Sequence, residues 1–139
     1  MITRKLVWAC ALALVAGSAL AGAVDPEQVT IDLDERQAQG DIATARYSKN
    51  DLELIGCGVN YFSDGFGGTF VFGFCQAQDA DEVYVACFVE DPGLIEAIQS
   101  ISDFSFIRFD WDEQEECTRI GNSTQSFYLP NYTRRGDDK

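Results

Sequence analysis

The positions of the cysteines constrain the fold of this chain more than any other feature does. One cysteine lies in an apolar N-terminal stretch, and the others lie in the rest of the chain, where they can form disulfides. Cys10 lies in the apolar stretch, and four further cysteines follow it. A zinc site of four thiolates would need closely spaced pairs such as C-x-x-C, and the spacings here are far longer. Four cysteines in an exported domain most simply form two disulfides. The expected disulfide residues are Cys57, Cys75, Cys87 and Cys117.

Residues 1–21 have the composition of a secretory signal peptide. Two basic residues precede an apolar run over residues 6–15, which is too short to span a bilayer. Small residues before the end of the segment favour cleavage after Ala21. A lipid anchor at Cys10 is disfavoured, because cleavage there would cut the apolar run in half. We therefore expect an exported protein, periplasmic or extracellular.

The net charge of the chain limits the classes of partner that it can bind. Asp and Glu number 23 against 10 Lys and Arg, a formal net charge of −13, and loss of the leader makes it more negative. Such a surface repels nucleic-acid phosphates and anionic lipids, so we expect neither nucleic acid nor a membrane as partner. A cationic protein is the partner that this charge attracts. The alternative is that excess carboxylate only keeps an exported protein soluble.

The remaining length suits one domain. Residues 22–44 are polar and predict a loosely ordered arm, with a short edge strand near Val29 as the alternative. Residues 45–132 form the predicted domain, and residues 133–139 form a charged tail.

The hydrophobic pattern within the domain predicts an α+β fold. Asp91-Pro92 is a strong helix start, because Asp can cap the helix and Pro fits its first position. About ten residues of helical periodicity follow. The expected order is β-β-β-α-β-β, an antiparallel five-stranded sheet with one short helix on one face, stapled by disulfides. The predicted strands cover 52–62, 69–77, 82–90, 104–111 and 117–122.

The second predicted strand is apolar on both sides. Phe70, Phe72 and Phe74 alternate with Val71 and Cys75, which indicates that something covers each face of the sheet. We expect the helix to cover one face of the sheet. The N-terminal arm and the apolar C-terminal stretch 126–130 are expected to cover the other face. The alternative is that the three phenylalanines form a self-association or partner surface.

Hairpin geometry reduces the number of possible disulfide pairings. The first predicted turn brings Cys57 close to Cys75, and the second brings Cys75 close to Cys87. Cys57 and Cys87 then lie two strands apart, at about 9–10 Å, which is too far to bridge. This favours Cys57–Cys75 with Cys87–Cys117, and Cys75–Cys87 with Cys57–Cys117 is the alternative.

A series of short motifs runs through the predicted domain in this order: Ala45-Arg46-Tyr47-Ser48, Ile55-Gly56-Cys57, Cys75, Cys87, Asp91-Pro92, Phe109-Asp110-Trp111-Asp112, Cys117-Thr118 and Asn122-Ser123. The series resembles a group of small exported bacterial proteins. They share four cysteines, a W-D-x(4)-C-T hairpin and a proline-bearing tail like that at Pro130. The resemblance covers about residues 45–130. The group has no established activity, so the resemblance implies a four-cysteine framework and no catalytic or binding residue.

Carboxylates are the main candidates for chemistry. The sequence has no histidine, which excludes Ser-His and Cys-His nucleophile pairs, and no phosphate-binding glycine motif, so we expect no cofactor. Asp110 and Asp112 project from one face of a strand, with Glu113 in the turn behind them. These oxygens suit calcium or carboxylate-based hydrolysis. The alternative is a solvated hairpin end that prevents edge-to-edge aggregation.

These observations favour an exported, non-enzymatic binding or interaction module. An inhibitor of a cationic hydrolase such as a lysozyme is the first alternative, because a rigid acidic scaffold complements a basic enzyme. A calcium-binding or carboxylate-based hydrolytic protein is the second. The sequence leaves the ligand and the oligomeric state open.

Overall fold

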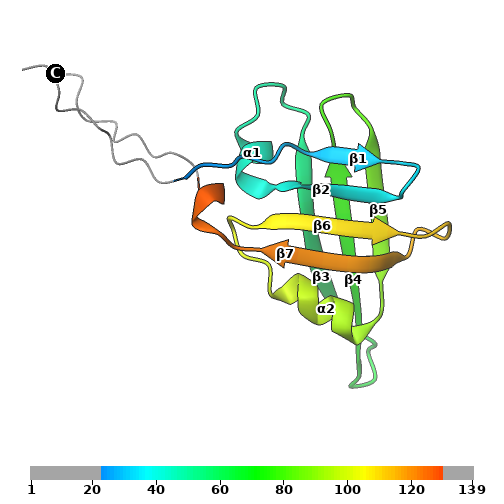
Figure 1. Ribbon diagram of the computed structural model, residues 1–139. Helices are drawn as coiled ribbons and strands as arrows, with labels where there is room; N and C mark the ends of the chain where they lie inside the picture. The colour runs from blue at the N-terminus through cyan, green and yellow to red at the C-terminus, as the bar shows by residue number, and fades with distance from the viewer. Residues whose placement is uncertain (1–22, 130–139) are drawn as a thin grey trace, which may run out of the picture.

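The computed structural model describes residues 23–129, which form two antiparallel sheets whose strands run across one another (Figure 1). The four-stranded sheet has the order β1-β2-β6-β7, and the three-stranded sheet has the order β3-β4-β5. The four-stranded sheet contains β1 (Thr30–Asp32), β2 (Gln37–Asp41), β6 (Phe106–Trp111) and β7 (Cys117–Ser123). The three-stranded sheet contains β3 (Leu54–Ser63), β4 (Thr69–Gln78) and β5 (Tyr84–Val89). The helical segments are α1 (Ile42–Arg46), α2 (Pro92–Gln99) and the 3₁₀ turn η1 (Ser126–Tyr128).

The predicted single five-stranded sheet is wrong. All five predicted strands and the helix are present close to their expected positions, but they are divided between two sheets. After β5, helix α2 carries the chain across to the facing sheet (Figure 1). There β6 pairs with β2, with Ala38 opposite Phe109, instead of extending the three-stranded sheet beside β5. The protein is therefore mostly β, with short helices.

The expected loose arm over residues 22–44 is also wrong. From residue 23 onwards this segment contributes β1, β2 and the start of α1, and it buries Val29 and Ala38 in the core. At Gly40 the two stretches of backbone approach so closely that an added Cβ would lie 3.0 Å from the Val29 Cα. The domain therefore begins well before residue 45. The expected signal peptide with Cys10, the residue Pro130 and the predicted charged tail at 133–139 lie outside the described residues.

A buried carboxylate fixes the start of α1. Asp41 is only 1% exposed, and its carboxylate accepts hydrogen bonds from the backbone N–H groups of Glu27 (2.7 Å) and Thr44 (2.6 Å). The Thr44 hydroxyl donates to it as well, at 2.6 Å. One side chain thus caps the helix and ties the N-terminal segment to it.

The two ends of the described chain lie side by side (Figure 1). The Asp25 N–H donates to the Phe127 carbonyl at 3.2 Å, and the Tyr128 ring stacks on Phe106 with centroids 5.7 Å apart. Burial, followed by nearby carboxylates of which Glu27 is the strongest, raises the pKa of the Tyr128 hydroxyl. The residues just before Pro130 therefore pack onto the domain.

Helix α2 closes one end of the core between the sheets. It begins as predicted, with Pro92 at its first position and the Asp91 carboxylate accepting the Leu94 N–H at 3.0 Å. Its buried face packs into a space left by Gly73 of β4, where an added Cβ would meet Ile98 at 2.7 Å. None of the helices within residues 23–129 is long and apolar enough to cross a membrane.

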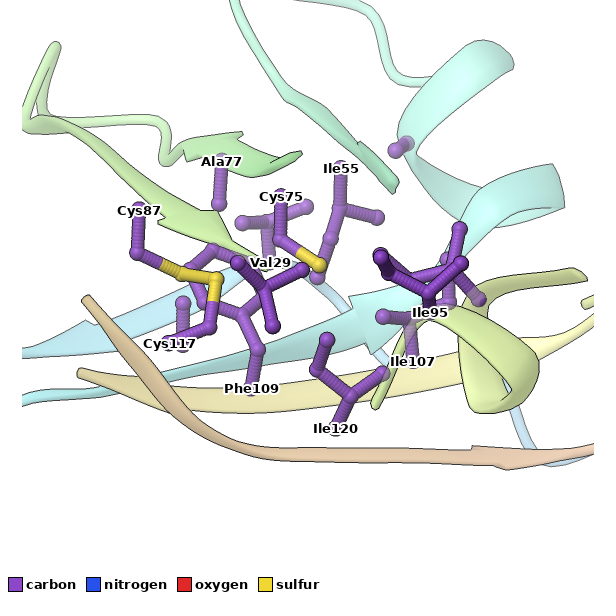
Figure 2. Close-up of a cluster of buried hydrophobic side chains, with 14 residues drawn as sticks. Val29, Ile55, Cys75, Ala77, Cys87, Ile95, Ile107, Phe109, Cys117 and Ile120 are labelled. Carbon is purple, nitrogen blue, oxygen red and sulfur yellow. A yellow bond between two sulfur atoms is a disulfide. The ribbon is translucent and has the colours of Figure 1, made fainter. Parts of the chain in front are cut away.

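Two disulfides staple this core. Cys57–Cys75 joins directly paired positions of β3 and β4, and Cys87–Cys117 links β5 of one sheet to β7 of the other. This confirms the pairing favoured by hairpin geometry. Figure 2 shows the second disulfide beside Phe109, where side chains from both sheets meet. Two disulfides indicate folding in an oxidising compartment, such as the periplasm or the extracellular space.

Candidate binding surface

The outer face of the three-stranded sheet carries a cluster of exposed aromatic rings. The expectation that the arm and the tail would cover this face is wrong, because the arm belongs to the four-stranded sheet and Tyr128 packs against β6. Helix α2 packs on the inner face of the same sheet. Within residues 23–129 the outer face is left open to solvent. We call this cluster the aromatic face; it comprises Phe62, Phe70, Phe72, Phe74 and Phe88.

Strand register brings these five rings together. Phe62 lies opposite Phe70, and Phe74 lies opposite Phe88, so all five side chains leave the sheet on the same side. The Phe62 and Phe72 rings are stacked with centroids 5.7 Å apart, and Phe72 and Phe88 are 6.4 Å apart. Phe62, Phe70 and Phe88 are 49%, 51% and 53% exposed. The rings therefore form one continuous patch across three strands.

Gly58 allows one of these rings to lie on the sheet. A Cβ at Gly58 would lie 2.9 Å from the ring of Phe74, its partner across the strand pair. The ring occupies the space that a side chain would otherwise fill, which leaves Phe74 partly buried. A glycine at this position in β3 therefore shapes the aromatic face.

The outer face of the four-stranded sheet provides an internal comparison. It is polar, and Asp110 forms ion pairs there with Arg108 (3.3 Å) and Arg119 (3.6 Å). Alternation along β6 sends Ile107 and Phe109 inward between these polar side chains. This is the usual pattern of an antiparallel sheet with one solvated face. The three-stranded sheet departs from it.

The hairpin between β3 and β4 extends beyond α2 (Figure 1). The Asp64 carboxylate accepts the N–H groups of Phe66 (2.8 Å) and Gly68 (2.9 Å), and these bonds lower its pKa. Gly65 and Gly67 have positive φ angles, as a tight glycine-rich turn requires. Phe66 is held at this tip, 96% exposed. The predicted glycine-rich hairpin connection is therefore confirmed.

The carboxylates proposed from the sequence for calcium or hydrolysis are not gathered into a site. Asp110 lies between two arginines, as described above. Asp112 accepts backbone N–H groups of its own turn, and Glu113 pairs with Arg36 at 2.9 Å. No group of three or more acidic, cysteine or histidine side chains among residues 23–129 could hold a metal ion.

No family model, curated protein or solved structure matches this chain. The resemblance to four-cysteine exported proteins therefore stays a hypothesis, and the aromatic face itself carries the functional argument. Sequence reasoning found Phe70, Phe72 and Phe74 as a candidate surface but missed Phe62 and Phe88. Their positions opposite Phe70 and Phe74 in the predicted hairpins were the signal that could have found them.

Proposed function

We propose that this chain is an exported, non-catalytic binding module and that the aromatic face is its binding surface. The observation that carries the proposal is a continuous patch of five phenylalanines that no other described element covers. Removing the exposed half of one such ring from water is worth about 1 kcal/mol, so a partner that covers several rings gains substantially. Contiguous exposed apolar patches of this kind mark interaction sites in soluble proteins.

The rest of the chemistry supports a role without catalysis. The sequence contains no histidine, and all four cysteines of the described chain are in disulfides. Of the proposed carboxylates, Asp110 and Glu113 are ion-paired and Asp112 stabilises a turn. A glycosidase needs two carboxyl groups facing each other across a cleft, whereas these carboxyl groups are engaged in ion pairs and in a turn.

Site-specific photo-crosslinking tests this proposal. A benzophenone-bearing phenylalanine analogue is introduced at Phe70 on the aromatic face, and at Arg119 on the polar outer face as a matched control. Each protein is irradiated in a periplasmic or extracellular extract of the producing cells. We expect a discrete adduct from position 70 alone, which excess unlabelled protein removes by competition. Equal labelling from both positions, or none from position 70, contradicts the proposed surface, and a partner recovered in cleaved form contradicts the non-catalytic role.

Inhibition of a hydrolase is a second candidate, favoured by the projecting hairpin. Phe66 stands at the tip of a turn that Asp64 holds in shape, as a segment that enters an enzyme cleft would require. The activity of a basic lysozyme, measured with increasing amounts of this protein, tests it. We expect Phe66→Ser to abolish inhibition and Leu33→Ser, an exposed apolar change in the turn between β1 and β2, to preserve it. Unchanged lysozyme activity at saturating protein removes this candidate.

A further inference from the structure

Positive charges are confined to part of this chain, whereas carboxylates occur throughout it. Residues 50–105, which include the three-stranded sheet and α2, contain no lysine, arginine or histidine. All five cationic side chains of the described chain lie outside this segment: Arg36, Arg46, Lys49, Arg108 and Arg119. The same segment carries ten carboxylates: Asp51, Glu53, Asp64, Asp79, Asp81, Glu82, Glu90, Asp91, Glu96 and Asp103.

The ion pairs follow the same division. Those found within residues 23–129 join Arg36 to Glu113, and Arg108 and Arg119 to Asp110. None of them includes a carboxylate from the segment 50–105. The segment of the chain that bears the aromatic face therefore contributes carboxylates and no cation to the molecular surface.

A hollow of about 290 Å³ opens beside the aromatic face at Phe88. Strand β5 meets the segment before β7 here, since the Phe88 N–H donates to the Glu115 carbonyl at 2.9 Å. An aromatic ring beside carboxylates is the environment that a lysine or arginine side chain prefers. The hollow is lined by Phe88, Val89, Glu90, Asp91, Glu116 and Cys117.

We propose that the aromatic face docks a cationic polypeptide segment in which lysine or arginine is interleaved with apolar residues. Its apolar side chains cover the rings of Phe62, Phe70 and Phe72, while one basic side chain enters the hollow beside Phe88. This assignment rests on the proposed function and adds the chemistry of the partner.

Charge and shape together select this occupant. A second copy would place one cation-free acidic surface against another, and phosphates or anionic lipids would be repelled in the same way. The rings are spread over three strands of an open sheet face, whereas small molecules favour enclosed concave sites. Complementary charge with apolar contacts across a broad face is characteristic of protein–protein recognition.

Binding of defined peptides tests the proposal. The probe is a short fluorescent peptide that alternates lysine with leucine, and its Kd is measured by anisotropy. One control peptide replaces leucine with serine and so keeps the charge. Another replaces lysine with glutamate and so keeps the apolar residues. We expect the lysine–leucine peptide to bind at least about tenfold more tightly than either control. We also expect its binding to weaken in about 0.3 M salt.

Paired variants show whether binding occurs at the aromatic face. We expect Phe70→Ser/Phe72→Ser to raise the Kd at least about tenfold, and Leu33→Ser to leave it within about twofold. The double variant Glu90→Gln/Glu116→Gln changes only exposed carboxylates at the hollow, and so serves even if the first variant fails to fold. We expect it to raise the Kd at least about threefold more than Asp34→Asn/Glu35→Gln, which removes equal charge from the turn between β1 and β2.

Several results would overturn this assignment. Equal effects of the hollow and control charge variants would mean that the peptide senses only net charge. Tight binding of the glutamate–leucine peptide would remove the cationic requirement. Dimers in sedimentation equilibrium that Phe70→Ser abolishes would assign the face to a second copy. A competed crosslink at Phe70 to a non-basic protein would contradict this inference while leaving the proposed function intact, and absence of any such crosslink would contradict both.

Discussion

Removing the Cys87–Cys117 disulfide should show how far the two sheets depend on their covalent link. The chain-entropy model gives a loss of about 3.6 kcal/mol for its sequence separation of 30 residues, and about 3.2 kcal/mol for the separation of 18 in Cys57–Cys75. Loop entropy alone therefore predicts nearly equal losses. Either loss is a large part of the total stability expected for a domain of this size.

The two disulfides differ in where they lie in the fold, and this should make their contributions to stability unequal. Cys57 and Cys75 lie on strands that are already paired over ten positions, whereas Cys87 and Cys117 join different sheets and are both buried. Replacing the second pair with alanine leaves a void in the core that adds about 1 kcal/mol. We therefore expect Cys87→Ala/Cys117→Ala to lower the free energy of unfolding by about 4–5 kcal/mol.

Urea denaturation of the oxidised variants, followed by circular dichroism, measures these losses. The two disulfide loops do not overlap in sequence, so removing both should give a loss close to the sum of the two. Each removal should also raise the m-value, because an unfolded chain without the link exposes more surface. A loss below about 1 kcal/mol for Cys87→Ala/Cys117→Ala, or one smaller than for Cys57→Ala/Cys75→Ala, would refute this reasoning.

Three further predictions concern single residues. Gly73→Ala should lower the free energy of unfolding by about 1–3 kcal/mol, because its Cβ would meet Ile98 at 2.7 Å. Gly56→Ala places its Cβ in open space and should be neutral or stabilising. Equal melting temperatures for the two variants would contradict this prediction. Asp41→Ala should lower the free energy of unfolding by about 2–4 kcal/mol, because it leaves buried hydrogen-bond donors without their acceptor. Asp91→Ala, which removes an exposed helix cap, should cost about 1 kcal/mol. A smaller loss at position 41 than at position 91 would count against the buried network. The lowered pKa of Asp64 means that its ionised form favours the ordered hairpin tip, an effect present above the ordinary aspartate pKa and lost as pH falls through the lowered one. An NMR titration of its carboxyl group with a midpoint at or above the ordinary aspartate pKa would disprove this.

Local patterns predicted much of this fold. Alternation and turn residues placed five strands, and the resulting register was sufficient to favour the correct disulfide pairing. Asp91-Pro92 placed the start of α2. Each of these inferences depends on neighbouring residues or on a short hairpin, where sequence spacing fixes geometry.

The division into two sheets could not be predicted in this way. Strand β2 has the sequence Gln37-Ala38-Gln39-Gly40-Asp41, in which polar residues alternate with the smallest side chains and β-propensity is low. It becomes a strand because β6, far along the chain, supplies its partner and because Val29 requires a neighbour as small as Gly40. Tertiary packing, rather than local preference, decides that this segment is a strand.

The candidate surface was only partly predictable for a related reason. Apolar residues on both sides of β4 correctly indicated that each face needs a cover. Pattern alone does not say whether the cover comes from the same chain. Here β6 and β7 join β2 to cover the inner face, and Phe62, Phe70 and Phe88 stay exposed on the other side.

The charge distribution offers a reason why the protein tolerates such a surface. An exposed aromatic sheet face promotes association between copies unless something opposes it. In this chain the segment that carries the face has acidic residues and no cation, so two copies that approach through it repel each other. The repulsion becomes an attraction when the approaching surface is basic. Under the proposed function, one arrangement of charge thus serves both purposes: it keeps identical molecules apart and leaves the rings available to a partner of opposite charge.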